Sequence, residues 1–283
     1  MADPTEHIRA LARRVVEAAV ELGPLRAALL AGSGARGDAD RYSDVDLLLY
    51  VEQSPPDDRL EELRDALGGV NSVWISRPAL IQFEVGGVAV QVGYQTVAEM
   101  DEELEKALVR LEEIVGSPNQ KMLSGFLEGL PLHGEDVIAG WRDRAAAYPD
   151  ELRRAAIEHH WRFFPLWYYG DAMAARDSEL WRLDMLLEGA FNLLGVLTAL
   201  NRVYFARFEL KRLRALVAKL DLAPPDLADR LETLFRLPAH EAAEAFGALV
   251  VETRDLVARE LPDVELPLRR PPGTRIEPWP LEP

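Results

Sequence analysis

The sequence predicts an α+β fold, in which a small mixed β-sheet domain with flanking helices is followed by an all-α helical bundle. Up to about residue 96, short apolar or alternating runs bounded by glycine and proline mix with helical patterns. Beyond that point the apolar residues recur at helical spacing, with almost no strand signal. We therefore predict a sheet domain at residues 1–130, a helical domain at 131–265 and a proline-rich tail at 266–283.

The runs of the first half define its elements in order. Residues 1–23 form an amphipathic helix, with Asp3 as N-cap, Pro4 at the first helical position and Glu6 completing a capping box. A short apolar run at residues 25–33 ends in glycine and serine. Strands are predicted at residues 44–53 and 71–76, with a helix at 55–69 between prolines and glycines. Two alternating runs within residues 79–95 meet at Gly86-Gly87, which indicates a β-hairpin.

The second half consists of helical patterns separated by short connections. A long connector at residues 117–136 follows the first of these helices. The predicted helices are residues 96–116, 135–147, 150–169, 178–200, 209–220, 224–237 and 240–260.

Composition restricts the class of protein. Of the 283 residues, 48% are hydrophobic, which is enough to form a core in one large or two ordinary domains. The net charge of −16 repels a phosphate backbone, which argues against a nucleic-acid partner. The absence of cysteine excludes disulfides, thiolate zinc sites and cysteine nucleophiles.

Targeting signals are not evident. The N-terminal helix lacks the basic start and uninterrupted apolar stretch of a signal peptide, so we expect a cytoplasmic protein. The most apolar helix, near residues 185–200, contains Glu188 and Asn192, and we expect it to be too short and too polar to span a bilayer. No membrane partner is predicted.

The stretch AGSGARGDADRYSDVDLLLYV, residues 31–51, combines a glycine-rich turn with two aspartates. Gly32, Gly34 and Gly37 permit a tight turn that brings backbone amides close to an anion, and Ser33 adds a hydroxyl donor. A strand follows the turn directly. An anion-binding turn is therefore predicted at the edge of the sheet.

The aspartates of this stretch lie two residues apart at the start of that strand. Asp44 and Asp46 therefore project from one face, whereas Val45 and Leu47 project into the core. Two like charges this close need a compensating cation. Beside an anion-binding turn, the two carboxylates provide a binding site for a divalent metal ion that bridges to phosphates.

Gly32-Ser33, ten intervening residues and then Asp44-Val45-Asp46 resemble the signature of the DNA polymerase β-type nucleotidyltransferase superfamily. The stretch is especially similar to small bacterial members, namely aminoglycoside and lincosamide nucleotidyltransferases and minimal nucleotidyltransferases. The alternative is a surface turn beside a solvated acidic strand end.

The resemblance implies roles for individual residues. Gly32 and Ser33 would hold the β- and γ-phosphates of an NTP, and Asp44 and Asp46 would ligate two Mg²⁺ ions. A substrate hydroxyl would then attack the α-phosphate and release pyrophosphate. The candidate nucleotide-binding residues within the motif are Gly32, Ser33, Arg36 and Ser43.

The family usually supplies a third carboxylate from a later strand, and here the sequence departs from the pattern. Alternation along residues 88–96 turns the valines to the core and Gln91 to the site, and glutamine cannot act as a base at neutral pH. Three outcomes stay open. Glu84, roughly opposite Ala89 in the hairpin, supplies the carboxylate, the helical domain supplies the base, or catalysis is weak or absent.

The helical half offers further candidates. Asp184, Glu188 and Asn192 recur every fourth residue of one apolar helix. They form either a satisfied polar stripe or solvated edge, or a wall of the acceptor pocket with Glu188 as the catalytic base. Lys211, or alternatively Lys121, would reach the triphosphate, unless both belong to solvated helix faces.

One further stretch of the helical half attracts attention. His159 and His160 project about 100° apart on a helix, so they are poorly placed to chelate one metal and are interpreted as packing or pocket-lining residues. Residues 161–170 contain six aromatic side chains, either as core or as a wall for a base or aromatic substrate.

Together these features predict a Mg²⁺-dependent nucleotidyltransferase that moves a nucleoside monophosphate, with AMP favoured, to a hydroxyl of a small molecule. The acidic surface suits a cationic acceptor such as an aminoglycoside antibiotic. Two alternatives are kept, a toxin-like enzyme that modifies a protein or tRNA, and a nucleotide-binding regulatory protein with a degenerate site. The sequence does not define the acceptor, the preferred base or the oligomeric state.

Overall fold

The computed structural model describes residues 3–110, 114–116, 120–164, 176 and 178–267. The chain divides into two compact units, one of residues 1–110 with 122–147 and one of residues 111–121 with 148–283. The first unit extends beyond the predicted boundary at residue 130 because a strand and a helix after that point pack on its sheet.

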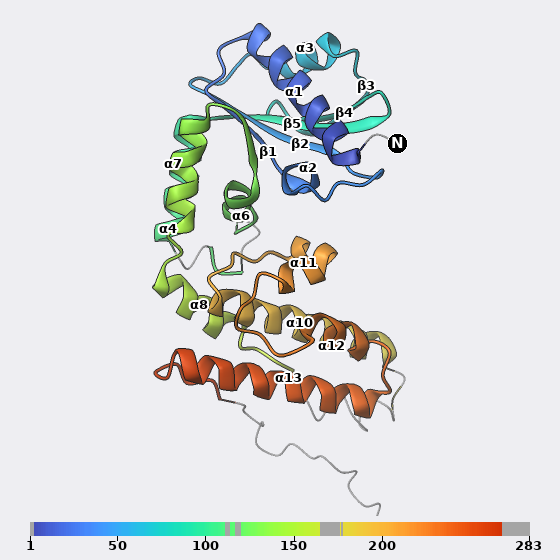
Figure 1. The fold of residues 1–283 in the computed structure, drawn as a ribbon, viewed down its shortest axis with the longest axis vertical. Coiled ribbons are helices and arrows are strands. Elements are labelled where there is room, and N and C mark those ends of the chain that lie inside the picture. Colours follow the sequence, from blue (N-terminus) through green and yellow to red (C-terminus); the bar gives the residue numbers. More distant parts are fainter. Residues whose placement is uncertain (1–2, 111–113, 117–119, 165–175, 177, 268–283) are drawn as a thin grey trace, which may run out of the picture. The chain divides into compact units, whose positions relative to one another are not determined.

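A six-stranded mixed sheet forms the centre of the first unit, in the order β3-β4-β5-β2-β1-β6 (Figure 1). The strands β2 and β5 run parallel, and the other neighbouring strands run antiparallel. The predicted α+β class is confirmed. The strands are β1 (Ala27–Leu30), β2 (Val45–Val51), β3 (Val70–Ser76), β4 (Leu80–Val85), β5 (Val88–Thr96) and β6 (Leu130–His133).

The strand β6 lies inside the predicted connector, which also contains a helix, α6 (Gln120–Glu128). The prediction of almost no strand beyond residue 97 is therefore wrong at this point. With four residues, one of them Pro131, β6 has no alternating pattern of its own, and its pairing with β1 makes it a strand.

The helices of the first unit lie on both faces of the sheet (Figure 1). On one face, α1 and α3 bury Val45, Leu47 and Leu49 of β2. On the other face, Trp141 of α7 packs against Tyr50 with ring centroids 4.6 Å apart. Besides α6, the helices are α1 (Pro4–Leu22), α2 (Gly32–Arg36), α3 (Arg59–Ala66), α4 (Val97–Val109) and α7 (Glu135–Ala146).

The start of α1 differs from the prediction in one detail. Asp3 is the N-cap and accepts a hydrogen bond from the Thr5 amide at 3.0 Å. The Glu6 carboxylate does not complete a capping box, because it lies 3.4 Å from the Arg9 guanidinium instead. A capping box does form at α4, between Thr96 and Glu99.

The second unit is helical in the part that the structure describes. Its central helix, α10, packs against α8 and α13. The predicted helix at residues 209–220 is divided into a 3₁₀ helix and a short α-helix. The elements are α8 (Asp150–His160), α10 (Glu179–Leu200), η2 (Arg207–Arg212), α11 (Leu213–Val217), α12 (Leu227–Leu234) and α13 (Ala239–Glu260).

With 22 residues, α10 has the length and apolar composition to cross a membrane. The expectation that this helix is too short and too polar is therefore wrong. Within the unit, 67% of its most apolar 18-residue window is buried, which is typical of the core helix of a helical domain.

Candidate active site

The predicted turn at residues 32–37 forms a single helical turn, α2. Its three glycines are required for two different reasons, backbone conformation and packing. Gly32 (φ +67°) and Gly37 (φ +84°) adopt the left-handed region that glycine favours. Gly34 is needed for packing, because a Cβ atom there would lie 2.5 Å from Cγ2 of Ile8 on α1. The turn is thus held directly against the first helix.

The Asp46 carboxylate lies against this turn. A Cβ atom at Gly32 would be 2.5 Å from Asp46 Oδ2, so only glycine leaves room for the carboxylate in this position. The Ala31 amide also donates a hydrogen bond to the Asp46 carbonyl at 2.8 Å. The predicted neighbourhood of glycine turn and aspartate is therefore present in the fold.

The strand begins at Val45, one residue later than the predicted strand. Asp44 directly precedes it and is exposed, whereas Asp46 is half-buried. Val45 and Leu47 have 0% and 2% of their surface exposed, which confirms that they face the core. Asp46, which lies between these two residues in the strand, therefore belongs to the opposite face, and the placement of Asp44 on the same face stays a prediction.

Gln91 is the next side chain across the sheet from Asp46. The parallel register of β2 and β5 pairs the two residues, and adjacent strands lie about 4.8 Å apart. On the other side of β5, Gln91 pairs with Gln82 of β4. The position beside Asp46 therefore carries an amide, which can ligate a metal through oxygen but has no titratable proton.

Glu84 is paired with Ala89, as predicted, and so belongs to the sheet face that carries Gln91. Its strand, β4, is two strands from β2, or about 10 Å at the usual spacing. The Glu84 carboxylate accepts a hydrogen bond from the Asn71 side chain at 3.2 Å. Glu84 is therefore directed toward the outer part of the sheet rather than toward an ion shared with Asp46.

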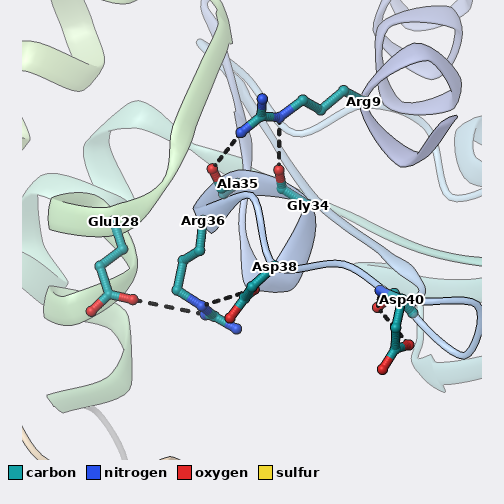
Figure 2. Close-up of polar contacts among 8 residues, drawn as sticks. Arg9, Gly34, Ala35, Arg36, Asp38, Asp40 and Glu128 are labelled. Carbon is teal, nitrogen blue, oxygen red and sulfur yellow. Dashed lines mark hydrogen bonds and ion pairs between the residues drawn. The ribbon is translucent and has the colours of Figure 1, made fainter. Parts of the chain in front are cut away.

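Two further candidates, Arg36 and Ser43, lie between Gly32 and the start of β2. The Arg36 guanidinium, at the end of α2, is 3.5 Å from the Asp38 carboxylate and 3.8 Å from that of Glu128 on α6 (Figure 2). The Ser43 hydroxyl accepts a hydrogen bond from the Asp40 amide at 2.9 Å, which closes the turn before β2. Their roles in nucleotide binding stay predictions.

A metal at this site would need ligands besides protein carboxylates. Among the residues that the structure describes, no group of three or more His, Cys, Asp or Glu side chains could hold a metal ion. Mg²⁺ is commonly bound by one or two carboxylates together with substrate phosphates and water. Asp44, Asp46 and the oxygen of Gln91 therefore fit an ion that is held jointly with a nucleotide.

In the second unit, the polar stripe of α10 divides into two kinds of residue. Asp184 and Glu188 are exposed, and the role of Glu188 as base stays a prediction. Asn192 is buried, with Oδ1 3.3 Å from His160 Nδ1 and Nδ2 donating to the Arg162 carbonyl at 2.7 Å. The satisfied-stripe interpretation therefore holds for Asn192.

The histidines behave as packing residues. Burial lowers the pKa of His160 to about 4, with the positive charge of Arg162 a smaller cause, and the hydrogen bond to Asn192 opposes the shift. Burial and the charge of Arg162 also lower the pKa of His159. Trp161, Phe163 and Phe164 pack around the core, whereas the predicted aromatic residues at 165–170 lie outside the described residues.

Both candidate lysines contact one exposed aromatic ring. The Nζ atoms of Lys121 and Lys211 lie 4.8 Å and 5.8 Å from the ring centre of Phe208. Such cation–π contacts hold a lysine side chain near the surface at little energetic gain. Contact of either lysine with a triphosphate stays a prediction.

Two cavities of the first unit, of about 210 and 290 Å³, share Val51, Arg59 and Tyr94 as walls and lie at the far end of β2. A seven-residue strand places that end about 20 Å from Asp44. There, burial raises the pKa of Tyr94 to about 12, while the charge of Arg59 opposes this shift. Neither of these two cavities has Asp44 or Asp46 among its walls, so the candidate site is identified by its chemistry.

Two residues beside the site carry no sequence motif. Gln82 is placed by the pairing of β4 with β5, and the alternation of residues 80–85 is the signal that indicates its face. Arg9 reaches the glycine turn from α1, and only the three-dimensional packing of the two helices reveals it (Figure 2).

Residues 12–128 match the family model described as a nucleotidyltransferase domain. This part of the chain is therefore a nucleotidyltransferase domain of the DNA polymerase β type, as the resemblance predicted. The family transfers nucleoside monophosphates and generally uses an NTP and a divalent metal ion.

No curated protein matches the chain. Among solved structures, the chain is similar to a nucleotidyltransferase-like protein from Exiguobacterium sibiricum 255-15, with 12% identity and a TM-score of 0.43. The similarity covers 89% of this chain and 77% of the other.

Proposed function

We propose that this protein transfers a nucleoside monophosphate, with AMP favoured, from an NTP to a hydroxyl group of a small molecule. The observation that carries the proposal is the position of the Asp46 carboxylate against Gly32, because it joins a metal-binding group to a phosphate-binding turn. The match of residues 12–128 to the nucleotidyltransferase domain supports the same reaction class.

In this reaction the β- and γ-phosphates lie against the Gly32–Ser33 turn, where backbone amides and the Ser33 hydroxyl donate hydrogen bonds. Asp44 and Asp46 would hold two Mg²⁺ ions, which when bound neutralise charge on the phosphates. The acceptor oxygen forms a bond to the α-phosphorus, and the bond from that phosphorus to the oxygen bridging to the β-phosphate breaks. Pyrophosphate leaves, and the hydroxyl proton passes to a base.

The sheet domain has no carboxylate at the position where the family usually has its third one. Gln91 cannot accept the proton, so the proton passes to solvent or to a carboxylate of the helical unit, for which Glu188 is our candidate. General-base help is typically worth about 10²–10⁴-fold in rate. We therefore expect a slow enzyme rather than an inactive one.

The acceptor has room on the outer part of the sheet face that carries Asp46. Gln82 and Val73 continue the row that starts at Asp46 and Gln91, and both are exposed. Beside them, the Glu84 carboxylate offers a partner for an amine. Together with the net charge of −16, this favours a cationic acceptor such as an aminoglycoside.

A second function is favoured by Gln91 itself. A site with two carboxylates and an amide can bind a metal–nucleotide complex without turning it over, as a regulatory protein would do. Modification of a protein or of tRNA is a further alternative, and the acidic charge argues against the tRNA version.

The test is pyrophosphate release from each of the four NTPs with Mg²⁺, with and without a panel of aminoglycosides, lincosamides and other hydroxylated compounds. The chain carrying Asp44→Asn and Asp46→Asn serves as the blank. We expect release that depends on an acceptor and is lost in the blank. Nucleotide binding without release on any acceptor, proteins included, would favour the regulatory function instead.

A further inference from the structure

The glycine turn cannot hold its own geometry. With five residues, α2 is far below the length at which a helix is stable alone. Its last carbonyl groups need donors, and the amides that follow, of Gly37 and Asp38, both bond to the Ser33 carbonyl, at 3.0 Å and 3.2 Å. The carbonyls of Gly34 and Ala35 are thus left to other partners.

Arg9 of α1 supplies those donors. Its Nε donates to the Gly34 carbonyl at 2.8 Å and its Nη2 donates to the Ala35 carbonyl at 2.9 Å (Figure 2). The planar guanidinium fixes the distance and direction between its donors, so the two bonds together orient α2. A positive charge at the carbonyl end of a helix is also favourable.

The neighbouring residue fixes the same element by packing. Ile8 directly contacts the Cα side of Gly34, where even a Cβ atom would not fit. Adjacent residues of α1 therefore hold the turn by two kinds of contact, apolar at Ile8 and polar at Arg9. The Glu6 carboxylate, 3.4 Å from Arg9 Nη1, supports the guanidinium from the solvent side.

We propose that Arg9 is a positioning residue for nucleotide binding, because it holds Gly34 and Ala35 so that the Gly32–Ser33 turn faces Asp46 and the triphosphate. This inference rests on the proposed function. Arg9 acts through the turn and does not itself contact the nucleotide. Its side chain is 24% exposed, so a substitution leaves no buried cavity of the kind that unfolds a domain.

The experiment measures the equilibrium binding of Mg²⁺ complexes of the four α,β-methylene NTPs and of inorganic tripolyphosphate. The variants are Arg9→Gln, Arg9→Lys and, as a matched control on the exposed face of α1, Arg13→Gln. The control makes the same change of charge and of residue. Melting temperatures of all variants are recorded without ligand.

We expect Arg9→Gln to weaken binding of the best NTP analogue and of tripolyphosphate by about tenfold or more, since two charge-assisted hydrogen bonds are lost. Arg9→Lys, which keeps the charge and one bond, should recover part of that loss. The melting temperature of Arg9→Gln should stay within about 4 °C of that of Arg13→Gln.

If Arg9→Gln binds the analogue and tripolyphosphate as tightly as the unmodified chain does, the positioning role is overturned. An equal loss of affinity in Arg9→Gln and Arg13→Gln also overturns it, because the loss would then follow from the change in overall charge. If the unmodified chain binds none of the four analogues, the proposed function fails first and the inference fails with it.

Discussion

Two polar side chains interrupt apolar elements in the two units, and the structure treats them differently. Asp46 of β2 is half-buried and lies against Gly32, beside an amide at Gln91. Asn192 of α10 has 7% of its surface exposed, and both ends of its amide contact the protein, at His160 and at Arg162.

The exposure and the partners of these two side chains separate a role in function from a role in stability. A buried polar group that is hydrogen-bonded within the protein contributes to folding and has nothing to offer a ligand. A partly exposed carboxylate against a glycine-rich turn is placed where it can ligate a cation from solvent. Substitutions at the Asp46 turn should therefore affect chemistry, and substitutions around Asn192 should affect stability.

Gly32→Ala is expected to reduce the rate of transfer more than any other substitution considered. The new Cβ atom displaces the Asp46 carboxylate, and misplacement by about 1 Å can reduce the rate by about 10²-fold. Gly86→Ala is the matched control, because Gly86 has a similar φ of +59° with nothing within 4 Å of its Cβ position. Pyrophosphate release per folded molecule should fall only in Gly32→Ala, and an equal fall in both would remove the distinction.

The second prediction concerns pH and the helical unit. Because the folded-state pKa of His160 is about 4 and the ordinary value is 6.5, the unfolded chain binds the proton more tightly. The stability from neutral His160 is complete above pH 6.5 and is lost as the pH falls toward 4. Between pH 7.5 and pH 4.5 this amounts to about 2.5 kcal/mol.

Urea unfolding at the two pH values, for the unmodified chain and for His160→Gln, measures this contribution as the difference between their pH dependences. Glutamine does not titrate, so the variant should lack that part of the pH dependence. If the free energy of unfolding changes with pH by the same amount in both proteins, folding does not lower the pKa of His160.

The third prediction tests Asn192 as a structural residue. Asn192→Ala leaves the His160 ring and the Arg162 carbonyl without this partner, which should lower the free energy of unfolding by about 2 kcal/mol. Thr198→Val on the same helix is the control, since the Thr198 hydroxyl donates to carbonyls of its own helix. Loss of transfer activity per folded molecule in Asn192→Ala would contradict the structural role.

The smallest expected effect is a gain. Gln91→Glu places a carboxylate beside Asp46, where the family usually has one, and should raise the rate about tenfold. Gln95→Glu makes the same change four residues further along β5, about 13 Å away, and should leave the rate unchanged. If neither substitution raises pyrophosphate release, the missing carboxylate at position 91 does not limit the rate of transfer.

Much of the fold and of the candidate site is visible in the sequence, because short-range patterns determine these features. The period-two alternation of β5 predicts that Gln91 faces away from the core, and the Gly86-Gly87 pair predicts the hairpin that places Glu84 opposite Ala89. The spacing from Gly32 to Asp46 predicts their proximity, because a glycine turn and the start of the next strand meet at one sheet edge.

The remaining features depend on contacts between segments far apart in sequence. β6 exists because β1 offers a free edge, and Arg9 matters because α1 crosses beside α2, 25 residues along the chain. The position of Glu84, two strands from β2, follows from the strand order and not from its own neighbours. Neither hydrophobic periodicity nor a local motif carries such information.

Mn²⁺ binding followed by electron paramagnetic resonance tests whether the Gly32 turn and the two aspartates form one metal–nucleotide site. Mn²⁺ replaces Mg²⁺ at oxygen ligands and reports its own coordination. With each α,β-methylene NTP in turn, the unmodified chain should bind Mn²⁺ tightly, and both Asp46→Asn and Gly32→Ala should lose that binding while Gly86→Ala keeps it. Undiminished Mn²⁺–nucleotide binding by Asp46→Asn would contradict the account.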